Sequence, residues 1–245
     1  MKKEGKSKTK GQAAWLAFMV IAAPLCGAGT GPQTPGSTSG ANPAINQPYQ
    51  DPNYDRWVQV FERSGREVFD RRLEIVENVG LRPGMTVADI GAGTGLFTRL
   101  FAARVGAVGK VIAVDISDEF ARNILRTSRQ QGLTNVEAVV NTQSSTGLAP
   151  ESIDLAFICD TYHHFEYPQA MMSSVYQALR SDGEVIIIDF RRVPGSNGPW
   201  IMDHVREGKE GVIREMQQAG FRFVEAKDFM RSNYFLRFVK DENGP

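Results

Sequence analysis

From Tyr54 onward, segments in which apolar residues recur at helical spacing alternate with short, continuously apolar runs. The apolar runs predict buried strands at residues 86–90, 110–114, 136–140, 153–159 and 184–189. The helical spacing predicts an amphipathic region from Trp57 to Leu81 and helices at about 96–104, 118–131, 167–179 and 207–219. Segments Phe221–Lys227 and Tyr234–Lys240 predict an antiparallel pair. This alternation indicates an α/β fold with a parallel sheet covered by helices on both faces.

The first 28 residues have the pattern of an export leader. Five lysines within Met1–Lys10 precede an apolar stretch, Ala13–Leu25, and a group of small residues. This order predicts a secretory signal peptide or membrane anchor over residues 1–28, and with it a periplasmic or cell-envelope location with membrane contact only through the leader. The alternative is a wrongly assigned start codon or a cytoplasmic tail, and with either of them a cytoplasmic location. Residues 29–52, rich in Gly, Pro, Ser and Asn, predict a flexible linker before a domain over 53–245.

The charge balance argues against one class of function, nucleic-acid binding, and the few cysteines and histidines argue against a zinc site. Lys plus Arg and Asp plus Glu number 28 each, so the formal net charge is zero. That balance argues against the strongly basic surface of a nucleic-acid-binding domain, and no nucleic-acid partner is expected. The two cysteines and three histidines nowhere show the spacing of a zinc site, so the sequence predicts no metal.

A glycine-rich turn follows the first predicted strand. Residues 87–97 read V-A-D-I-G-A-G-T-G-L-F, which leaves a strand and enters a helix. In open α/β sheets ligands bind at the carboxyl ends of the strands, and glycines let a ligand approach the backbone closely. The G-x-G-x-G spacing differs from the dinucleotide fingerprint G-x-G-x-x-G, and the P-loop pattern is absent. The turn therefore predicts a nucleotide-like ligand other than a dinucleotide, the alternative being a tight structural turn.

An acid ends the second predicted strand, about one strand–helix unit after the glycines. Asp115 closes the run Val111–Asp115, and a carboxylate in that place accepts hydrogen bonds from both ribose hydroxyls in dinucleotide sites. The alternative role is a helix N-cap or a solvated loop acid. The glycine turn and Asp115 together favour a ligand that contains a nucleoside.

These motifs resemble those of the class I S-adenosylmethionine-dependent methyltransferases, and the resemblance runs through most of Met85–Lys240. Residues 87–95 are similar to the first motif of that family and residues 111–115 to the second. Residues 179–183 resemble its L-x-P-G-G turn but depart from it at Ser181 and Asp182. The resemblance implies a Rossmann-like three-layer sandwich whose mostly parallel seven-stranded sheet has the order 3-2-1-4-5-7-6 and ends in an antiparallel hairpin.

The same resemblance implies a set of residues for S-adenosylmethionine. It gives the amino-acid end of the cofactor to Asp89 and the glycine turn, the ribose to Asp115, the adenine to Ile116, and the adenine amine to the exit of the third strand. Asp160, at the end of the fourth strand, faces the same cleft. The residues expected to bind the cofactor are Asp89, Gly91, Ala92, Gly93, Gly95, Asp115, Ile116, Asn141, Thr142 and Asp160.

Two adjacent histidines follow the fourth strand and are the candidates for acid–base chemistry. His163 and His164 have a side chain whose pKa suits a general base near neutral pH, and Tyr162 is an alternative. The competing interpretation is that the pair only lines the pocket. The segment 160–165 is similar to that of an uncharacterised bacterial branch of the family. His204 and Arg206 sit in a connection that often contributes to the acceptor pocket, or they are solvated loop residues.

The N-terminal helical region offers a candidate lid. In this family such a region often covers the cofactor, and here it contains Trp57, Phe61, Glu62, Arg66 and Glu67. The alternative is an ordinary amphipathic helix with solvated charges.

The sequence therefore predicts methyl transfer from S-adenosylmethionine to a small-molecule acceptor. Two other functions stay open. One is an envelope protein that binds the cofactor or a related nucleoside without turnover, and the other is a nicotinamide-dependent oxidoreductase.

Overall fold

The computed structural model describes residues 40–193 and 199–241. The predicted leader, residues 1–28, and the first part of the predicted linker lie outside these residues, so the export and location predictions stay predictions. Within the described ranges, no helix combines the length and the apolar character needed to cross a bilayer.

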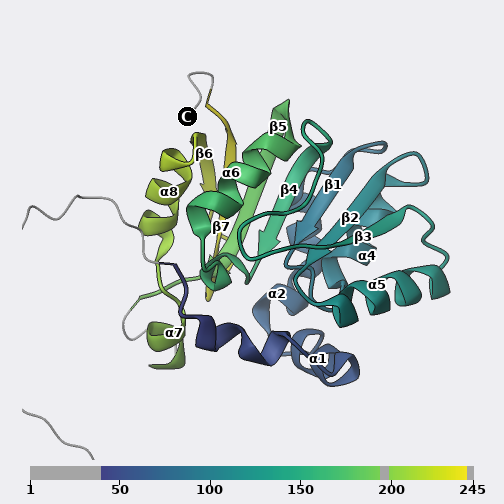
Figure 1. Ribbon diagram of the computed structural model, residues 1–245, viewed down its shortest axis with the longest axis horizontal. Coiled ribbons are helices and arrows are strands. Elements are labelled where there is room, and N and C mark those ends of the chain that lie inside the picture. The colour runs from purple at the N-terminus through teal and green to yellow at the C-terminus, as the bar shows by residue number, and fades with distance from the viewer. Residues whose placement is uncertain (1–39, 194–198, 242–245) are drawn as a thin grey trace, which may run out of the picture. The chain divides into compact units, whose positions relative to one another are not determined.

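Seven strands form one sheet in the order β3-β2-β1-β4-β5-β7-β6, as the resemblance implied (Figure 1). Neighbouring strands are parallel from β3 through to β5, whereas β7 is antiparallel to both β5 and β6. The strands are β1 (Thr86–Ile90), β2 (Lys110–Asp115), β3 (Val136–Val140), β4 (Ile153–Cys159), β5 (Leu179–Phe190), β6 (Phe221–Lys227) and β7 (Asn233–Lys240). The Rossmann-like three-layer fold is therefore confirmed.

Helices cover both faces of this sheet. Successive residues of a strand point to opposite faces, and in the central strands the residues on both faces are apolar. Ala88 and Ile90 of β1 pack with α6 (Pro168–Ala178) and α8 (Lys209–Gln218) on one face. Val87 packs on the other face with α3 (Arg72–Val79) and α4 (Leu96–Val105). Helix α5 (Asp118–Gln130) lies along β2 and β3. A strand buried on both faces reads as a continuous apolar run, which explains why these strands were predictable.

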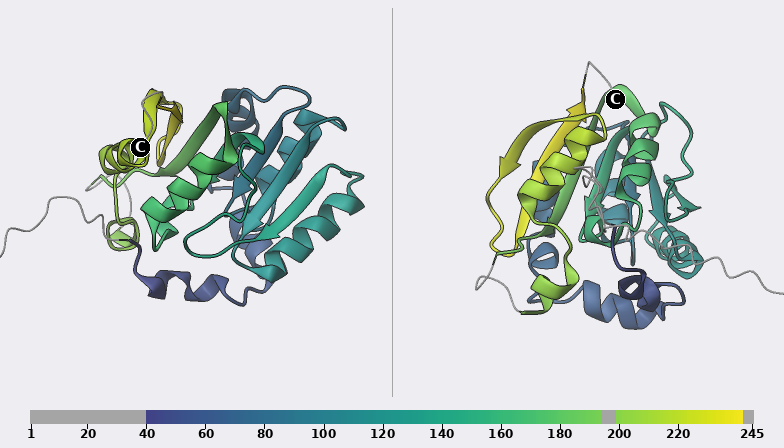
Figure 2. Two further views of the ribbon diagram at one scale, coloured as in Figure 1. Left: turned by 45° about the horizontal axis from the view of Figure 1, so that its top comes forward. Right: turned by 60° about the vertical axis from the view of Figure 1, so that its left-hand side comes forward.

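The amphipathic region before β1 folds as three short helices rather than one. These are α1 (Tyr54–Phe61), α2 (Glu67–Asp70) and α3. The Asn53 side chain accepts a hydrogen bond from the backbone N–H of Arg56 and caps α1. Gly65, with a φ of +91°, lies in the turn between α1 and α2. Helix α1 and the short helix α7 (Pro199–His204) lie beyond the carboxyl ends of the strands (Figures 1 and 2).

The predicted linker, residues 29–52, is shorter than its composition indicated. Pro43–Tyr49 form a 3₁₀ helix, η1. The backbone N–H of Ala41 donates to the carbonyl of Phe165 at 2.9 Å. Asn46 is buried at 7% exposure and donates to the His164 carbonyl and the Glu166 carboxylate. These hydrogen bonds attach the segment to the domain. Because they involve polar groups, the segment shows no apolar periodicity from which its structure could have been predicted.

Strand β5 begins earlier than the predicted 184–189, and α7 was not predicted. Leu179 already pairs with Ile153, and the next pair joins Glu184 to Leu155, so the intervening residues bulge out of the ladder. The turn expected at residues 179–183 is therefore a bulge inside a longer strand.

Candidate active site

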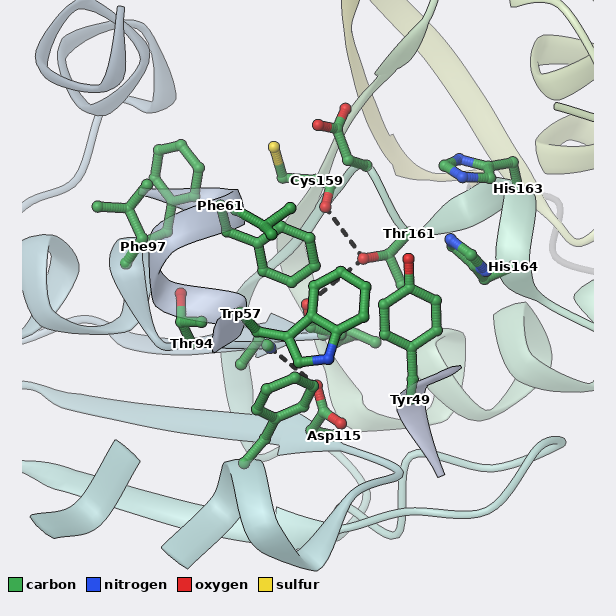
Figure 3. A pocket seen from close by; sticks show the side chains of 18 of the residues that line it. Tyr49, Trp57, Phe61, Thr94, Phe97, Asp115, Cys159, Thr161, His163 and His164 are labelled. Atoms are coloured by element: carbon green, nitrogen blue, oxygen red, sulfur yellow. Dashed lines mark hydrogen bonds between the residues drawn. The ribbon is translucent and has the colours of Figure 1, made fainter. Parts of the chain in front are cut away.

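A cavity of about 620 Å³ lies at the carboxyl ends of β1, β2, β4 and β5, beneath η1 and α1 (Figure 3). The turn after β1, Asp115 and the exit of β3 line one part of it, and His163, His164 and His204 line another. Its volume is within the range of small-molecule sites, about 300–1,000 Å³. The position is the one where open α/β sheets bind ligands.

The glycine turn is fixed by backbone hydrogen bonds and by one close packing contact. The N–H of Gly91 donates to the Val114 carbonyl at 2.7 Å, and the N–H of Gly93 donates to Asp115 Oδ2 at 2.8 Å. Gly91 has a φ of +71°, and a Cβ there would lie 2.2 Å from Cγ2 of Thr161. Only glycine fits this position without displacing Thr161.

Two buried carboxylates flank the turn. Asp89, 3% exposed, accepts a hydrogen bond from the Thr98 hydroxyl at 2.6 Å. Asp115, 6% exposed, accepts from the N–H groups of Gly93 and Ser117. Burial raises the pKa of both Asp89 and Asp115 to about 6, although these hydrogen bonds act in the opposite direction. Each Asp115 oxygen keeps a lone pair, so the carboxylate retains capacity to accept from a ligand hydroxyl.

The exit of β3 presents an unsatisfied acceptor. Asn141 Nδ2 donates to the Thr142 carbonyl, whereas Asn141 Oδ1 is buried and has no hydrogen-bond partner. Ile116 and Phe120 line the cavity nearby. Because a buried acceptor without a partner is costly, Oδ1 fits a ligand that brings an N–H donor, such as the adenine amine.

Asp160 also lines the cavity, but its carboxylate is bonded to the protein. Its Oδ2 accepts from Arg66 at 2.6 Å and its Oδ1 from Asn233 Nδ2 at 2.6 Å. Burial raises its pKa, partly offset by Arg66. Asp160 has a φ of +48°, in the left-handed region. It therefore anchors the segment that carries Arg66 at the rim of the cavity.

Three aromatic side chains from the N-terminal segment cover the cavity (Figure 3). The rings of Tyr49 and Trp57 are 4.8 Å apart between centroids, and so are those of Trp57 and Phe61. Phe61 also lies close enough to Gly93 that a Cβ there would be 3.4 Å from its ring. Glu62 pairs with Arg99 of α4 at 2.8 Å. The candidate lid is therefore placed over the glycine turn.

The histidine end of the cavity has a defined hydrogen-bond pattern. His163, 3% exposed, places Nδ1 2.7 Å from Oδ1 of Asp189, and His164 places Nδ1 2.8 Å from Oδ1 of Asn46. Burial lowers the pKa of His163, but Asp189 outweighs burial and the net shift is upward. Burial, followed by the neighbouring histidines, lowers the pKa of His164 to about 2, so this ring is uncharged.

His204 completes this end from α7. Its ring stacks on Trp200 with 4.4 Å between centroids. Its pKa is lowered by burial and by His163.

Some expected site residues do not reach the cavity. Tyr162 is 1% exposed, and its hydroxyl donates to the Glu215 carboxylate at 2.9 Å, away from the cavity lining. Arg206 pairs with the same Glu215 at 2.6 Å. Gly95 caps α4 and has a φ of +77°, and a Cβ there would meet Ile124 at 2.8 Å. Tyr162 and Arg206 are thus part of a buried polar cluster, and Gly95 shapes the helix start.

The remaining expected cofactor residues all line the cavity, together with residues that the sequence did not single out. Those missed include Asn46, Tyr49, Phe190, Trp200 and Asn233. Asn46 and Tyr49 lie in the supposed linker, and Asn233 belongs to the terminal hairpin. No local motif marks them, because only the tertiary fold brings these segments to the site.

The comparison with protein families decides the assignment of the fold. Residues 88–187 match a family model described as a methyltransferase domain, which spans β1 to β5 and includes the glycine turn, Asp115 and both adjacent histidines. The match covers 100 of the 245 residues and shows that this part of the chain is similar to methyltransferase domains. The chain is 26% identical over 142 residues to a ubiquinone/menaquinone biosynthesis C-methyltransferase of Hydrogenovibrio crunogenus. That match covers 58% of this chain and 55% of the relative, so the chain spans about half the length of the curated relatives it matches.

Solved structures show the same fold. A methyltransferase from Aquifex aeolicus, described as dependent on S-adenosylmethionine, superimposes on this one with a TM-score of 0.65 and 23% identity, covering 80% of this chain and 97% of its own. A Burkholderia thailandensis 1,6-didemethyltoxoflavin N1-methyltransferase, solved with S-adenosylhomocysteine bound, has a TM-score of 0.58 and 19% identity, covering 77% and 84%.

Proposed function

We propose that this protein transfers the methyl group of S-adenosylmethionine to a small-molecule acceptor. One observation carries the proposal: a single cavity joins the glycine turn and Asp115 at one end to three histidines at the other. The first end has the features that hold a nucleoside and an amino acid, and the second presents ring nitrogens to a separate ligand. The cavity thus has room for a donor and an acceptor side by side.

The cofactor end fits S-adenosylmethionine on two separate features. Asp115 has free acceptor capacity for the ribose hydroxyls, and Asn141 Oδ1 lacks the donor that the adenine amine supplies. The aromatic rings of Tyr49, Trp57 and Phe61 suit a cation, because aromatic faces attract positive charge. When bound, the cofactor supplies an activated methyl group on a sulfonium.

The chain's own contribution is to orient the acceptor and to control its proton. Methyl transfer requires the acceptor atom in line with the methyl group, and orientation is the main lever that a protein has over such a displacement. His163 and His164 border the acceptor end, and their Nδ1 atoms are held by Asp189 and Asn46. The two rings are therefore fixed in direction, with Nε2 left to act on the acceptor atom.

The experiment that tests this proposal measures methyl transfer directly. The full chain is incubated with S-adenosylmethionine carrying a labelled methyl group and with a panel of phenols, thiols, amines and quinone precursors. The last class is included because the curated relative acts in ubiquinone and menaquinone biosynthesis. Acceptor-dependent release of S-adenosylhomocysteine, with label in the acceptor, is the expected result. Cofactor binding without transfer to any acceptor favours the non-catalytic alternative, and binding of a nicotinamide cofactor instead favours the oxidoreductase.

A further inference from the structure

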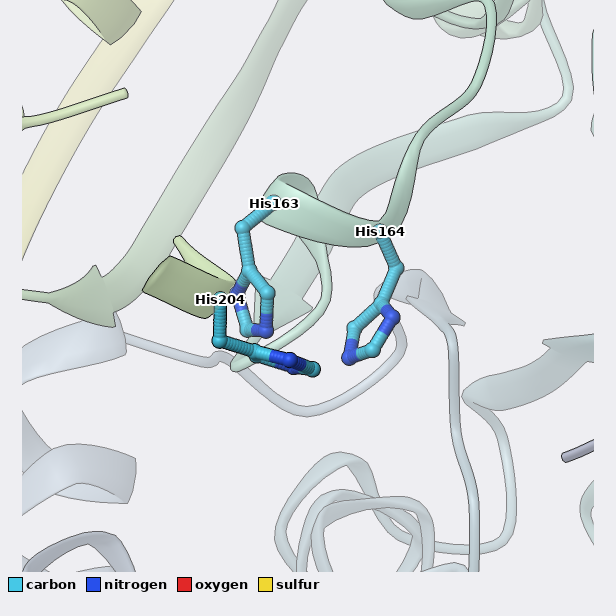
Figure 4. A group of neighbouring side chains, drawn as sticks. All are labelled: His163, His164 and His204. Atoms are coloured by element: carbon cyan, nitrogen blue, oxygen red, sulfur yellow. The ribbon is translucent and has the colours of Figure 1, made fainter. Parts of the chain in front are cut away.

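All three histidines of the chain meet at one place, although they come from two distant segments. His163 and His164 belong to the 3₁₀ helix η2 (Tyr162–His164), and His204 is the last residue of α7. The three rings face a common space (Figure 4), and one ring nitrogen from each lies within 4.8 Å of the others. The ring centroids are 4.2, 5.1 and 5.2 Å apart.

The hydrogen bond of His163 fixes which of its nitrogens is available. An ionised carboxylate only accepts, so Nδ1 of His163 carries the proton that bonds to Oδ1 of Asp189. Asp189, 1% exposed, is held in turn by the backbone N–H groups of His163 and Phe190. In the neutral ring, the free lone pair is therefore on Nε2.

The same logic applies to His164. Nδ2 of Asn46 donates to the His164 carbonyl and to Glu166, which identifies Oδ1 of Asn46 as the acceptor of the side-chain amide. Oδ1 lies 2.8 Å from Nδ1 of His164, so that nitrogen carries the proton and Nε2 carries the lone pair. In the described part of the chain, no hydrogen bond satisfies Nε2 of either ring. The Nε2 atoms of His163 and His164 are thus two hydrogen-bond acceptors in the same space, with no donor between them.

This arrangement is the one that metal-binding histidines adopt. A ligating imidazole typically donates its other N–H to a carboxylate or to a carbonyl oxygen, which fixes the tautomer and the direction of the ring. Here one ring has a buried carboxylate and another a buried amide oxygen in that role. Neutral imidazoles suit zinc and similar divalent ions, and three of them with one open position form a common type of catalytic zinc site.

We infer that His163, His164 and His204 bind one divalent metal ion of the zinc type through ring nitrogens, with the remaining position open to the cavity. In a tetrahedral site with Zn–N bonds of about 2.0–2.1 Å, ligand nitrogens are about 3.3 Å apart. The ligand nitrogens of the three histidines now lie within 4.8 Å of one another. A movement of less than about 1 Å by each ring brings them to the separation that zinc requires. The charged ion satisfies the facing lone pairs of His163 and His164.

The open position gives the metal a role in the proposed function and defines a class of acceptor. All three histidines line the cavity, so the fourth ligand comes from inside it. A bound divalent ion lowers the pKa of a hydroxyl or thiol that coordinates to it, which makes the oxygen or sulfur more nucleophilic. This acceptor class rests on the proposed function, whereas the metal site itself does not.

The test is metal binding by the untagged full chain. Zinc is titrated calorimetrically into protein treated with a chelator, and cobalt(II) is added in parallel so that its visible absorption reports the coordination geometry. One ion per chain and the strong absorption of four-coordinate cobalt are expected. His204→Gln should weaken zinc binding at least about 100-fold, and Asp189→Asn, which alters only the partner of a ligand, about 10- to 100-fold.

Asp203→Asn is the matched control, because Asp203 is the exposed neighbour of His204 and should bind zinc like the unchanged protein. Since the chain has no other histidine, loss of binding in His204→Gln reports this site alone. Absence of micromolar zinc binding in the unchanged protein, or equal binding by His204→Gln, would overturn the inference. S-adenosylhomocysteine is titrated into the same metal-free samples, so failure of the cofactor site is seen separately from failure of the metal site.

Discussion

The replacement Gly91→Ala tests whether the glycine turn is shaped by its contact with Thr161. The added Cβ would lie 2.2 Å from Cγ2 and 2.4 Å from Oγ1 of Thr161, distances that no packed structure tolerates. Gly91 also has a φ of +71°, which costs an alanine about 1–2 kcal/mol. The Thr161 hydroxyl donates to the Cys159 carbonyl at 3.0 Å, and turning it away loses about 1 kcal/mol more.

Together these effects predict a loss of about 2–3 kcal/mol in the free energy of unfolding. For a domain of this size, that loss lowers Tm by about 4–12 °C. In a Thr161→Gly background all three clashing atoms of the threonine side chain are gone, and Gly91→Ala should cost only the backbone strain of about 1–2 kcal/mol. The expected coupling between the two positions is therefore about 1 kcal/mol, above the roughly 0.5 kcal/mol found for independent sites.

The assay is urea unfolding of the four proteins of this cycle, with Gly80→Ala as the control. Gly80 has a φ of +78° in the left-handed helical region, but a Cβ there meets nothing within 4 Å. Replacing Gly80 should therefore cost only the backbone strain, in either background at position 161. If Gly91→Ala costs the same with and without the Thr161 side chain, or no more than Gly80→Ala, the proposed steric origin of this turn is incorrect.

Three further predictions follow from the site. Affinity for S-adenosylhomocysteine should fall as the pH drops below about 6, because protonation of Asp115, whose pKa is about 6, removes the charge that strengthens hydrogen bonds from the ribose. Calorimetry at pH 5 and pH 7 measures this, and an Asp115→Asn variant should have lost most of the difference. Tyr162→Phe should destabilise the fold by about 1–3 kcal/mol, since the buried Glu215 loses a donor, yet leave the rate of methyl transfer unchanged. An altered rate with unaltered stability would restore Tyr162 as a catalytic candidate. Trp57→Ala should weaken binding of the cationic S-adenosylmethionine more than that of neutral S-adenosylhomocysteine, and equal losses in the two titrations would argue against a cation–π role.

The strands were the most predictable part of this fold. Residues 86–90, 136–140 and 153–159 were expected as strands and are β1, β3 and β4. Burial between two helical layers makes such strands apolar throughout, and each ends at a turn residue. The first motif and Asp115 were equally visible, because they lie at the end of a predicted strand or immediately after one.

The histidine end of the cavity was only partly predictable from the sequence. His163 was identified, but its neighbour Tyr162 turns into the core, since consecutive residues of a 3₁₀ helix point in different directions. Asn46 was assigned to a linker because a single buried amide leaves no periodic pattern. The meeting of His204 with His163 depends on how α7 packs after β5, which no sequence spacing encodes.

The most direct test of the central claim is calorimetric titration of the full chain with S-adenosylhomocysteine, comparing the unchanged protein with Asp115→Asn and Asp118→Asn. Asp118 is an acid at the start of α5 that does not line the cavity, so its variant controls for loss of charge alone. Micromolar binding is predicted for the unchanged protein and for Asp118→Asn, with at least about tenfold weaker binding by Asp115→Asn. No binding by folded protein, or equal binding by all three, would contradict an S-adenosylmethionine site in this cavity.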